Sequence, residues 1–198
     1  MRVARDWLLI TVSPPGGGRS TLRVYAWRNL RGAGAHYLQQ SVCLLPATSA
    51  TTRTATKVVT RLRAEGGSGE VIRIQLVDSK QEAKVIDAIQ AERTDEYHEL
   101  VESTRQFHEE LAVERCRGRA TYTELEESDA DLARYQRWLA AIRARDYFDA
   151  PGGEEATAAV GSCEAALARF ESEALTAELD APESGAGARL RAVDDPDD

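Results

Sequence analysis

Apolar and polar positions follow two different periods along this chain, with the change near residue 79. In the first part, short apolar runs bounded by turn residues are typical of strands. They cover Trp7–Ser13, His36–Pro46 and Val71–Val77, and apolar and polar residues alternate in the last of them. The run His36–Pro46 fits either one bent strand or a tight pair of strands.

Between these runs, apolar residues recur every three to four positions, which predicts two helices. They extend over about residues 20–33 and 48–65, and glycines follow both. The order of strand, helix, one or two strands, helix and strand predicts an α+β fold. For residues 1–78 we expect a small ferredoxin-like antiparallel sheet with two helices on one face.

From residue 79 onward only helical spacing remains. The capping-box pattern of Ser79 and Glu82 begins a long predicted helix, with a break considered near Arg93. Two more helices are predicted, one on each side of Pro151. Short connections place consecutive helices antiparallel, so residues 79–180 should form a helical hairpin or a three-helix bundle.

The net charge of −8 conceals a division between the two ends of the chain. Residues 1–67 carry ten basic and two acidic residues, a net charge of +8, whereas residues 68–198 have a net charge of −16. This asymmetry indicates a surface for an anionic partner such as DNA. Residues 181–198 combine proline, glycine and acidic residues with few apolar ones, and we expect this tail to be disordered.

The composition also excludes several classes of protein. No apolar run approaches the roughly 20 residues of a membrane-spanning helix, so no membrane partner is expected. Three cysteines without CxxC spacing exclude a complete disulfide framework, and we expect a reducing, cytoplasmic location. The three histidines form no metal-ligand set, so we expect no metal and no cofactor. No catalytic motif is present, so the leading interpretation is a non-enzymatic protein, and a small enzyme is kept as an alternative below.

A glycine-rich segment between the first strand and the first helix is the strongest local signal. It resembles a phosphate-binding loop but departs from it at Ser13, in place of the first glycine, and at Arg19, in place of lysine. An NTPase is disfavoured because too few strands are predicted. A helix N-terminus attracts anions, so an oxyanion site and an ordinary turn both remain open. The candidate anion-binding residues are Gly17, Gly18, Arg19, Ser20 and Thr21.

Basic side chains on the two predicted helices are the candidates for nucleic-acid contact. Arg53, Lys57 and Arg61 are spaced four apart and form one ridge on the second helix. Such a ridge fits phosphate contact or an ordinary solvated face. The arginines of the first helix spread over about half of its circumference. The candidate nucleic-acid-binding residues are Arg23, Arg28, Arg31, Arg53, Lys57 and Arg61.

Cys116 is a candidate for redox chemistry because it lies between Arg115 and Arg117. Neighbouring cations favour the reactive thiolate form of a cysteine. The simpler alternative is a buried cysteine at the end of a helix.

A set of motifs spread over about residues 7–175 carries a family resemblance. The motifs are Trp7-Leu8-Leu9, Ser13-Pro14-Pro15, Arg23, Trp27-Arg28, Leu30, Gly34-Ala35, Leu38, Val42, Leu44-Leu45-Pro46, Phe107-His108-Glu109-Glu110, Glu114, Tyr122, Glu124-Leu125-Glu126, Trp138-Leu139, Ile142, Arg145-Asp146 and Phe148. Together they resemble the N-terminal region of the family of the chromate-resistance protein ChrB. More remotely, the segment from Leu38 to Val42 resembles PaaX-type repressors with a ferredoxin-like domain.

The resemblance implies a transcriptional regulator or accessory protein of chromate resistance. We therefore expect a module that binds DNA, takes an oxyanion such as chromate, and forms a homodimer through its helical region. Two alternatives remain open. One is an oxyanion or redox sensor, or a small enzyme, that uses Cys116; the other is an interaction module without a ligand.

Overall fold

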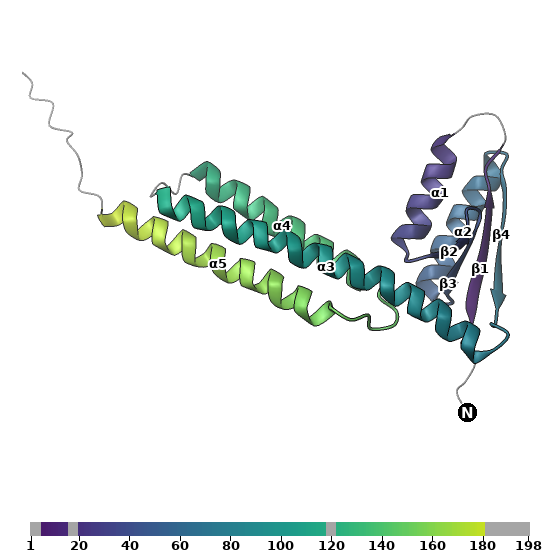
Figure 1. The fold of residues 1–198 in the computed structure, drawn as a ribbon. Helices are drawn as coiled ribbons and strands as arrows, with labels where there is room; N and C mark the ends of the chain where they lie inside the picture. The colour runs from purple at the N-terminus through teal and green to yellow at the C-terminus, as the bar shows by residue number, and fades with distance from the viewer. Residues whose placement is uncertain (1–4, 16–19, 118–121, 181–198) are drawn as a thin grey trace, which may run out of the picture.

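The computed structural model describes residues 5–15, 20–117 and 122–180 (Figure 1). The expected disordered tail, residues 181–198, lies outside them. Four strands and five helices are described. They are β1 (Trp7–Ser13), α1 (Ser20–Gly32), β2 (His36–Gln39), β3 (Val42–Pro46), α2 (Ser49–Ala64), β4 (Ser68–Ile74), α3 (Ser79–Arg117), α4 (Tyr122–Arg143) and α5 (Gly153–Asp180).

The strands form one antiparallel sheet in the order β2-β3-β1-β4. Strand β1 lies in the middle, where Ile10 is paired with Cys43 of β3 and with Val71 of β4. This order, with a helix after β1 and another after β3, confirms the predicted ferredoxin-like sheet. The run His36–Pro46, for which the sequence allowed one bent strand or two strands, forms the pair β2 and β3. The register of this pair is irregular between Tyr37 and Gln39.

Strand β4 begins three residues earlier than the alternating pattern indicated. Gly69 explains the difference, because a Cβ atom at this position would lie 2.5 Å from the carbonyl oxygen of Thr11. Such a distance is sterically forbidden, so a glycine is needed where β4 approaches β1. The sequence Gly66-Gly67-Ser68-Gly69 resembles a turn, although its last two residues are already part of the strand.

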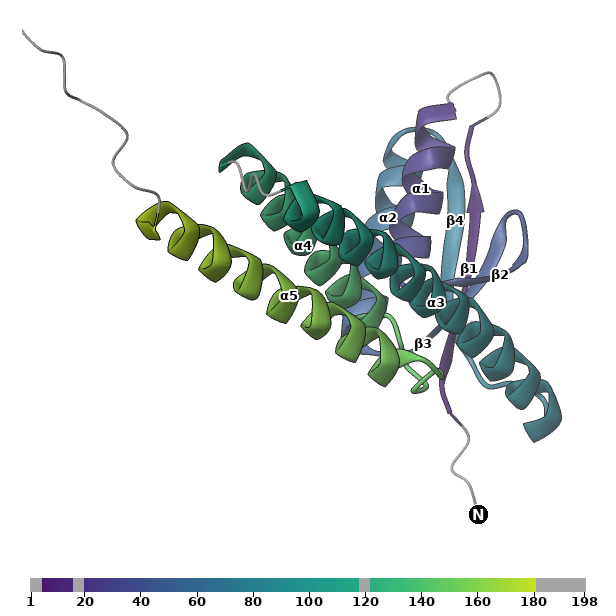
Figure 2. The ribbon, with the colours of Figure 1, turned by 60° about the vertical axis from the view of Figure 1, so that its left-hand side comes forward.

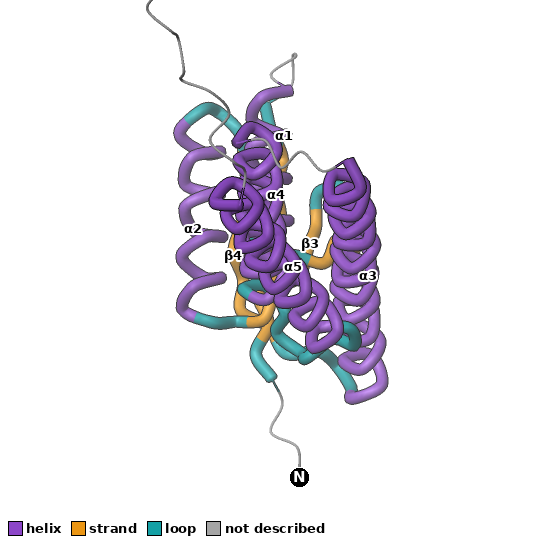
Figure 3. The backbone as a smooth tube through the Cα atoms, turned by 90° about the vertical axis from the view of Figure 1, so that its left-hand side faces the viewer, coloured by secondary structure: helices purple, strands orange, loops and turns teal. Residues whose placement is uncertain are grey.

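Helices α1 and α2 cover one face of the sheet, and α3 crosses the other. Figure 3 shows the strands between α2 on one side and α3 on the other. The first core contains alternate residues of β1, such as Leu8 and Ile10, with Leu30 and Leu62 from the two helices. On the opposite face Trp7, which is fully buried, packs with the following residues of β3 and α3: Leu44, Val85 and Ile89.

Helix α3 continues without a break for 39 residues, so the break considered near Arg93 is wrong. Its start also differs from the expected capping box. The carboxylate of Asp78, not Ser79, accepts a hydrogen bond from the backbone N–H of Gln81 at 2.8 Å. Glu82 instead accepts one from the indole N–H of Trp7 at 3.2 Å. The first turn of α3 is thus fastened to the sheet.

The C-terminal part of α3 forms a three-helix bundle with α4 and α5 (Figure 2). Its core is continuous, with Tyr97, Leu100 and Phe107 of α3 facing Tyr135 of α4 and Val160 of α5. Of the two arrangements that the sequence left open, the bundle is therefore the one formed. No helix within the described residues is long and apolar enough to cross a membrane.

Residues 144–150, most of the segment between α4 and α5, join the bundle to the sheet. The hydroxyl of Tyr147 donates to the carbonyl of Ala33 at 2.8 Å, and the side chain of Gln90 donates to the carbonyl of Phe148 at 2.7 Å. Gly34 has a φ of 81°, and a Cβ atom there would meet that of Arg145 at 3.0 Å. We refer to residues 144–150 as the junction segment.

A charged network lies beneath this segment and centres on Arg93, which is 2% exposed. Its Nη2 lies 3.3 Å from Glu92 and 3.2 Å from Glu96. Glu96 also accepts from Arg145 at 2.8 Å, and Glu92 lies 3.1 Å from Nδ1 of His36. The Nε and Nη1 atoms of Arg93 have no hydrogen-bond partner among the described residues. Burial lowers the pKa of Arg93 despite the attraction of Glu96.

Replacement of Arg93 by Met should stabilise the protein. The change removes two unsatisfied buried donors, while Glu96 keeps Arg145 and Glu92 keeps His36 as partners. A buried donor without a hydrogen bond costs about 1–3 kcal/mol, so removing two of them should outweigh the loss of the contacts with the two partly exposed carboxylates, and we expect a net gain of about 1 kcal/mol in the free energy of unfolding. Urea denaturation followed by circular dichroism measures it.

The matched variant is Glu96→Gln, which leaves Arg93 and Arg145 close together with one carboxylate fewer. It should lose about 2 kcal/mol. A destabilised Arg93→Met together with an unaffected Glu96→Gln would show that Arg93 acts mainly through the packing of its aliphatic stem.

Candidate anion and nucleic-acid interface

The outer surface of α1 and α2 is a continuous basic layer. No acidic residue occurs from Ser20 to Ala64. We call the exposed basic side chains of these two helices the basic layer; they are Arg23, Arg28, Arg31, Arg53, Lys57, Arg61 and Arg63. The two helices pack side by side, so their charges contribute to one positive potential at this end of the molecule.

The predicted ridge on α2 contains two kinds of side chain. Arg53 and Lys57 are exposed and have no hydrogen bond or ion pair with any described residue. Arg61 is anchored instead, because its guanidinium lies 4.1 Å from the ring centre of Tyr25 and its Nε donates to Glu65 at 2.9 Å. The ridge therefore presents two free cations and a third held between the helices.

A local cap fixes the start of α2 against the sheet. The hydroxyl of Thr48 accepts from the backbone N–H of Thr51 at 3.1 Å, and that of Thr51 accepts from the backbone N–H of Thr48 at 2.9 Å. Thr51 is buried and lies 2.5 Å from the carbonyl of Pro46, to which it can also donate. These contacts hold the ridge of α2 in a defined position relative to β3.

A groove of about 840 Å³ lies between α1 and the β2–β3 hairpin. The wall on α1 carries Trp27 with Arg23 one turn before it and Arg31 one turn after it. Trp27 is 49% exposed, and the guanidinium of Arg31 lies 5.7 Å from its ring centre. The other lining residues are Val12, Ser13, Pro14, Val24, Ala26, Tyr37, Gln39, Gln40 and Ser41.

The groove is suited to anionic and aromatic groups. None of its described lining residues carries a carboxylate, so nothing within it neutralises the two arginines. The hydroxyl of Tyr37 is buried without a hydrogen-bond partner among the described residues. Burial raises the pKa of Tyr37 to about 12, so its hydroxyl stays protonated at neutral pH and is available as a donor.

Trp27 and Tyr37 were not among the candidate site residues, although Trp27 belongs to the motifs that carry the family resemblance. Arg23, Trp27 and Arg31 are spaced four apart, and this spacing alone places an aromatic ring between two cations on one ridge. The arginines of the helix taken without the tryptophan spread over half of its circumference, so they show no ridge by themselves. Tyr37 has no comparable local signal, since it lines the groove only after the hairpin folds against α1.

The glycine-rich loop gives a more limited picture. Gly17, Gly18 and Arg19 lie outside the described residues, and Ser20 and Thr21 form the first positions of α1, with Thr21 exposed. An anion site at this loop stays a prediction.

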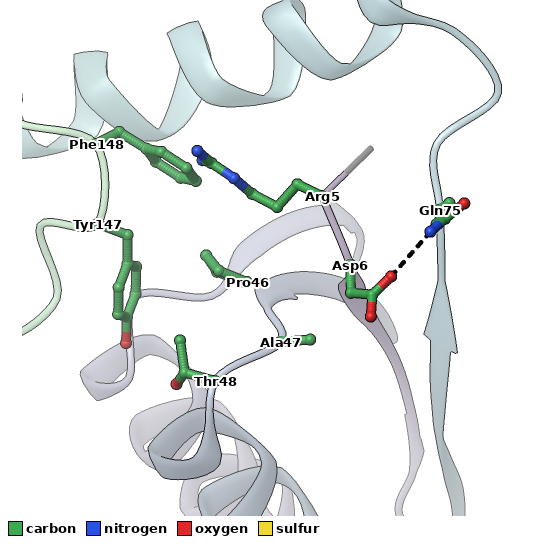
Figure 4. Close-up of a pocket in the computed structure, with 8 residues that line it drawn as sticks. All are labelled: Arg5, Asp6, Pro46, Ala47, Thr48, Gln75, Tyr147 and Phe148. Atoms are coloured by element: carbon green, nitrogen blue, oxygen red, sulfur yellow. Dashed lines mark hydrogen bonds between the residues drawn. The ribbon is translucent and has the colours of Figure 1, made fainter. Parts of the chain in front are cut away.

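A second hollow of about 530 Å³ lies where β1, the start of α2 and the junction segment meet (Figure 4). Arg5 extends toward Phe148, with its guanidinium 4.7 Å from the ring centre. Asp6 accepts from Gln75 and from Arg73, both at 3.1 Å, and these bonds hold the pKa of Asp6 below its ordinary value. Because Arg5 stacks on Phe148 and Asp6 is bonded to Gln75 and Arg73, both charged groups of this hollow already have protein partners, and the hollow is a structural joint.

The cysteines occupy different environments. Cys116 is exposed near the end of α3, so the alternative of a buried helix-end cysteine is wrong. Its neighbour Arg115 is paired with Glu173 at 2.6 Å. Cys43 and Cys163 are fully buried, and burial raises the pKa of their thiols to about 12 and about 11. Within the described parts of the chain, no group of three or more His, Cys, Asp and Glu residues could hold a metal ion.

Comparison with known proteins identifies the family of this chain. A family model described as Protein ChrB, N-terminal, matches residues 23–181, which include most of α1, the hairpin, α2 and all three helices of the bundle. The chain belongs to the ChrB N-terminal family. The resemblance to the ChrB N-terminal region that the sequence predicted is confirmed.

An individual member of the ChrB family is also similar. The chain is 28% identical over 144 residues to Protein ChrB of Cupriavidus metallidurans. The alignment covers 72% of this chain and 40% of that protein, so the match spans less than half of the relative's length. No solved structure matches the chain significantly.

The three thiols should differ sharply in reactivity. With a disulfide reagent at neutral pH, the folded protein should expose one reactive thiol per chain, and the denatured protein all three. The reason is that only Cys116 is exposed, whereas Cys43 and Cys163 are buried with raised pKa values. Absorbance of the released thiolate gives the count.

The variant Cys116→Ser should show no reactive thiol until it is denatured. A second thiol that reacts at the same rate in the folded protein would mean that one of the buried cores opens readily.

Proposed function

We propose that this chain is the DNA-contacting module of a ChrB-type regulator of chromate resistance. The observation that carries the proposal is the basic layer: its two adjacent helices contain no acidic residue, and Arg28, Arg53 and Lys57 have no ion pair with a described residue, whereas Arg61 and Arg63 are paired with Glu65 and Glu70. Membership of the ChrB family connects the chain with chromate resistance. The regulatory role, a cytoplasmic location and the response to an oxyanion are parts of the same proposal.

Charge distribution supports DNA as the partner. A protein that neutralises phosphates with Lys and Arg releases condensed counterions, and this release drives binding. Arg28, Arg53 and Lys57 are free of protein partners among the described residues, so contact with phosphate breaks no ion pair that the structure shows. Residues 79–180 have a net charge of −12, so the bundle is repelled by the same DNA. Repulsion at one end and attraction at the other orient the module.

The expected contacts are to the DNA backbone rather than to base edges. Arg53 and Lys57 are spaced as one ridge on α2, and phosphate contacts position a protein without reading sequence. The ridge alone therefore supports binding with little sequence preference.

Neutralising three free cations should weaken duplex DNA binding uniformly. In the variant Arg28→Ala/Arg53→Ala/Lys57→Ala, affinity at low salt should fall about 10- to 100-fold for any sequence. The slope of log K against log salt should also decrease by roughly 0.9 for each lost phosphate contact. Fluorescence anisotropy with labelled duplexes at several salt concentrations measures both.

A matched control removes three exposed arginines from the bundle end of the molecule, as Arg117→Ala/Arg137→Ala/Arg169→Ala. It changes the net charge by the same amount and should bind duplex DNA as the wild type does. The proposal is wrong if the wild type fails to bind duplexes at low salt, or if both triple variants lose affinity equally.

A further inference from the structure

We propose that the groove between α1 and the β2–β3 hairpin binds a nucleotide, with the base stacked on Trp27 and the phosphate held by Arg23 and Arg31. This site is distinct from the α2 ridge and does not depend on duplex binding. The shared ligand chemistry is an aromatic base that carries a phosphate. Its source is either a free nucleotide or an unpaired nucleotide of a single strand, and the experiment below separates the two.

The exposure of Trp27 is the first observation. The protein buries Trp7 completely, yet leaves 49% of Trp27 exposed. Val24, one turn earlier on the same wall of the groove, is 39% exposed. An exposed aromatic ring beside an exposed aliphatic side chain, within a hollow, marks a surface on which an apolar group can rest.

The placement of the two arginines is the second observation. Four residues of helix span about 6 Å, so Arg23 and Arg31 lie about one turn on either side of Trp27. An arginine guanidinium forms planar, paired hydrogen bonds with phosphate oxygens. A base on the ring of Trp27 therefore has a phosphate-binding group within reach at either end. Stacking on an aromatic side chain with an adjacent arginine is a general way to hold an unpaired base.

The opposite wall supplies polar groups for the edge of a base. The hairpin contributes the amide side chains of Gln39 and Gln40 and the hydroxyl of Ser41. Tyr37 also lines this wall, although its hydroxyl is buried beneath the surface of the groove. Bases held on aromatic platforms are commonly hydrogen-bonded at their edges by such groups.

The volume of the groove favours a nucleotide over a small inorganic ion as its ligand. At about 840 Å³ the groove lies in the range of roughly 300–1,000 Å³ typical of sites for organic ligands. A tetrahedral oxyanion would occupy a small fraction of the groove and would make no stacking contact with the exposed ring of Trp27. The combination of space, ring and paired cations fits an organic phosphate better.

The test uses the full chain and three probes: adenosine monophosphate, a short oligothymidylate and inorganic phosphate. Calorimetry gives affinities, and tryptophan fluorescence reports the ring. We expect at least one nucleotide probe to bind at least 10-fold more tightly than phosphate and to quench Trp27. Tighter binding of the oligothymidylate identifies a single strand as the source of the nucleotide, and comparable or tighter binding of the monophosphate identifies a free nucleotide.

Variants of α1 locate the site. Trp27→Ala should weaken nucleotide binding about 10-fold or more, whereas Trp27→Phe should retain most of the affinity and lose the fluorescence response. Arg23→Ala and Arg31→Ala should each weaken binding about 10-fold. Arg28→Ala is the matched control, because Arg28 is an exposed arginine of the same helix that does not line the groove. Circular dichroism and thermal melting confirm that each variant is folded.

The proposal is overturned if neither nucleotide probe binds, if inorganic phosphate binds as tightly as they do, or if Trp27→Ala leaves the affinity unchanged. It is also overturned if Arg28→Ala weakens nucleotide binding as much as Arg31→Ala does. The variant Arg28→Ala/Arg53→Ala/Lys57→Ala, which should bind duplex DNA about 10- to 100-fold more weakly, should bind the nucleotide as the wild type does. The two proposals are thus tested by different variants: the triple variant tests duplex binding, and the variants of Trp27, Arg23 and Arg31 test nucleotide binding.

Discussion

The rest of the structure depends on α3, one unbroken helix that packs against the sheet near its start and against α4 and α5 farther along. Near its start, Val85 and Ile89 complete the second face of the sheet around Trp7. Farther along, Leu100 and Phe107 supply the core of the bundle. Between these two contacts the helix places Arg93 in a buried position, at the level where the junction segment crosses. A break at that point would free the sheet and the bundle to move separately.

The network around Arg93 explains how the two parts keep a defined orientation. Glu92 connects α3 to His36 of β2, and Glu96 connects it to Arg145 of the junction segment. Tyr147 then reaches the turn before β2. Burying a cation between two carboxylates costs desolvation free energy. The directional bonds of the network restrict the angle between the sheet and the bundle, which apolar contacts do not do. The basic layer and the acidic bundle are consequently held apart.

This separation of charge gives the molecule two distinct surfaces near one another. The ridge of α2 offers free cations on a convex helix, a shape suited to a phosphate backbone. The groove beside α1 is concave and combines cations with an exposed ring, a shape suited to a single ligand. The match to the ChrB family begins at residue 23, and it includes the ridge of α2 and the walls of the groove on α1 and the hairpin, but not Val12, Ser13 and Pro14. Helix α1 therefore lies between the two surfaces on the sheet: the ridge of α2 on one side and the groove on the other.

Local periodicity determined most of the fold. The strands, both helices of the sheet domain and the three bundle helices follow from apolar spacing, because each element has to bury one face and its period records which residues lie on that face. The same reasoning found the ridge of Arg53 and Lys57, since both belong to one helix. It missed the true start of β4, where glycines that resemble a turn are required by the close approach of β1.

Only the tertiary structure decided which faces meet. The anchoring of Arg61 on Tyr25, the burial of Arg93 and the groove between Trp27 and Tyr37 each involve elements whose mutual placement has no local signature. Apolar spacing states that a face is buried but not what covers it. Arg93 therefore suggested a break in a helix when considered by itself, and became the centre of a junction once β2 and the segment after α4 were packed around it.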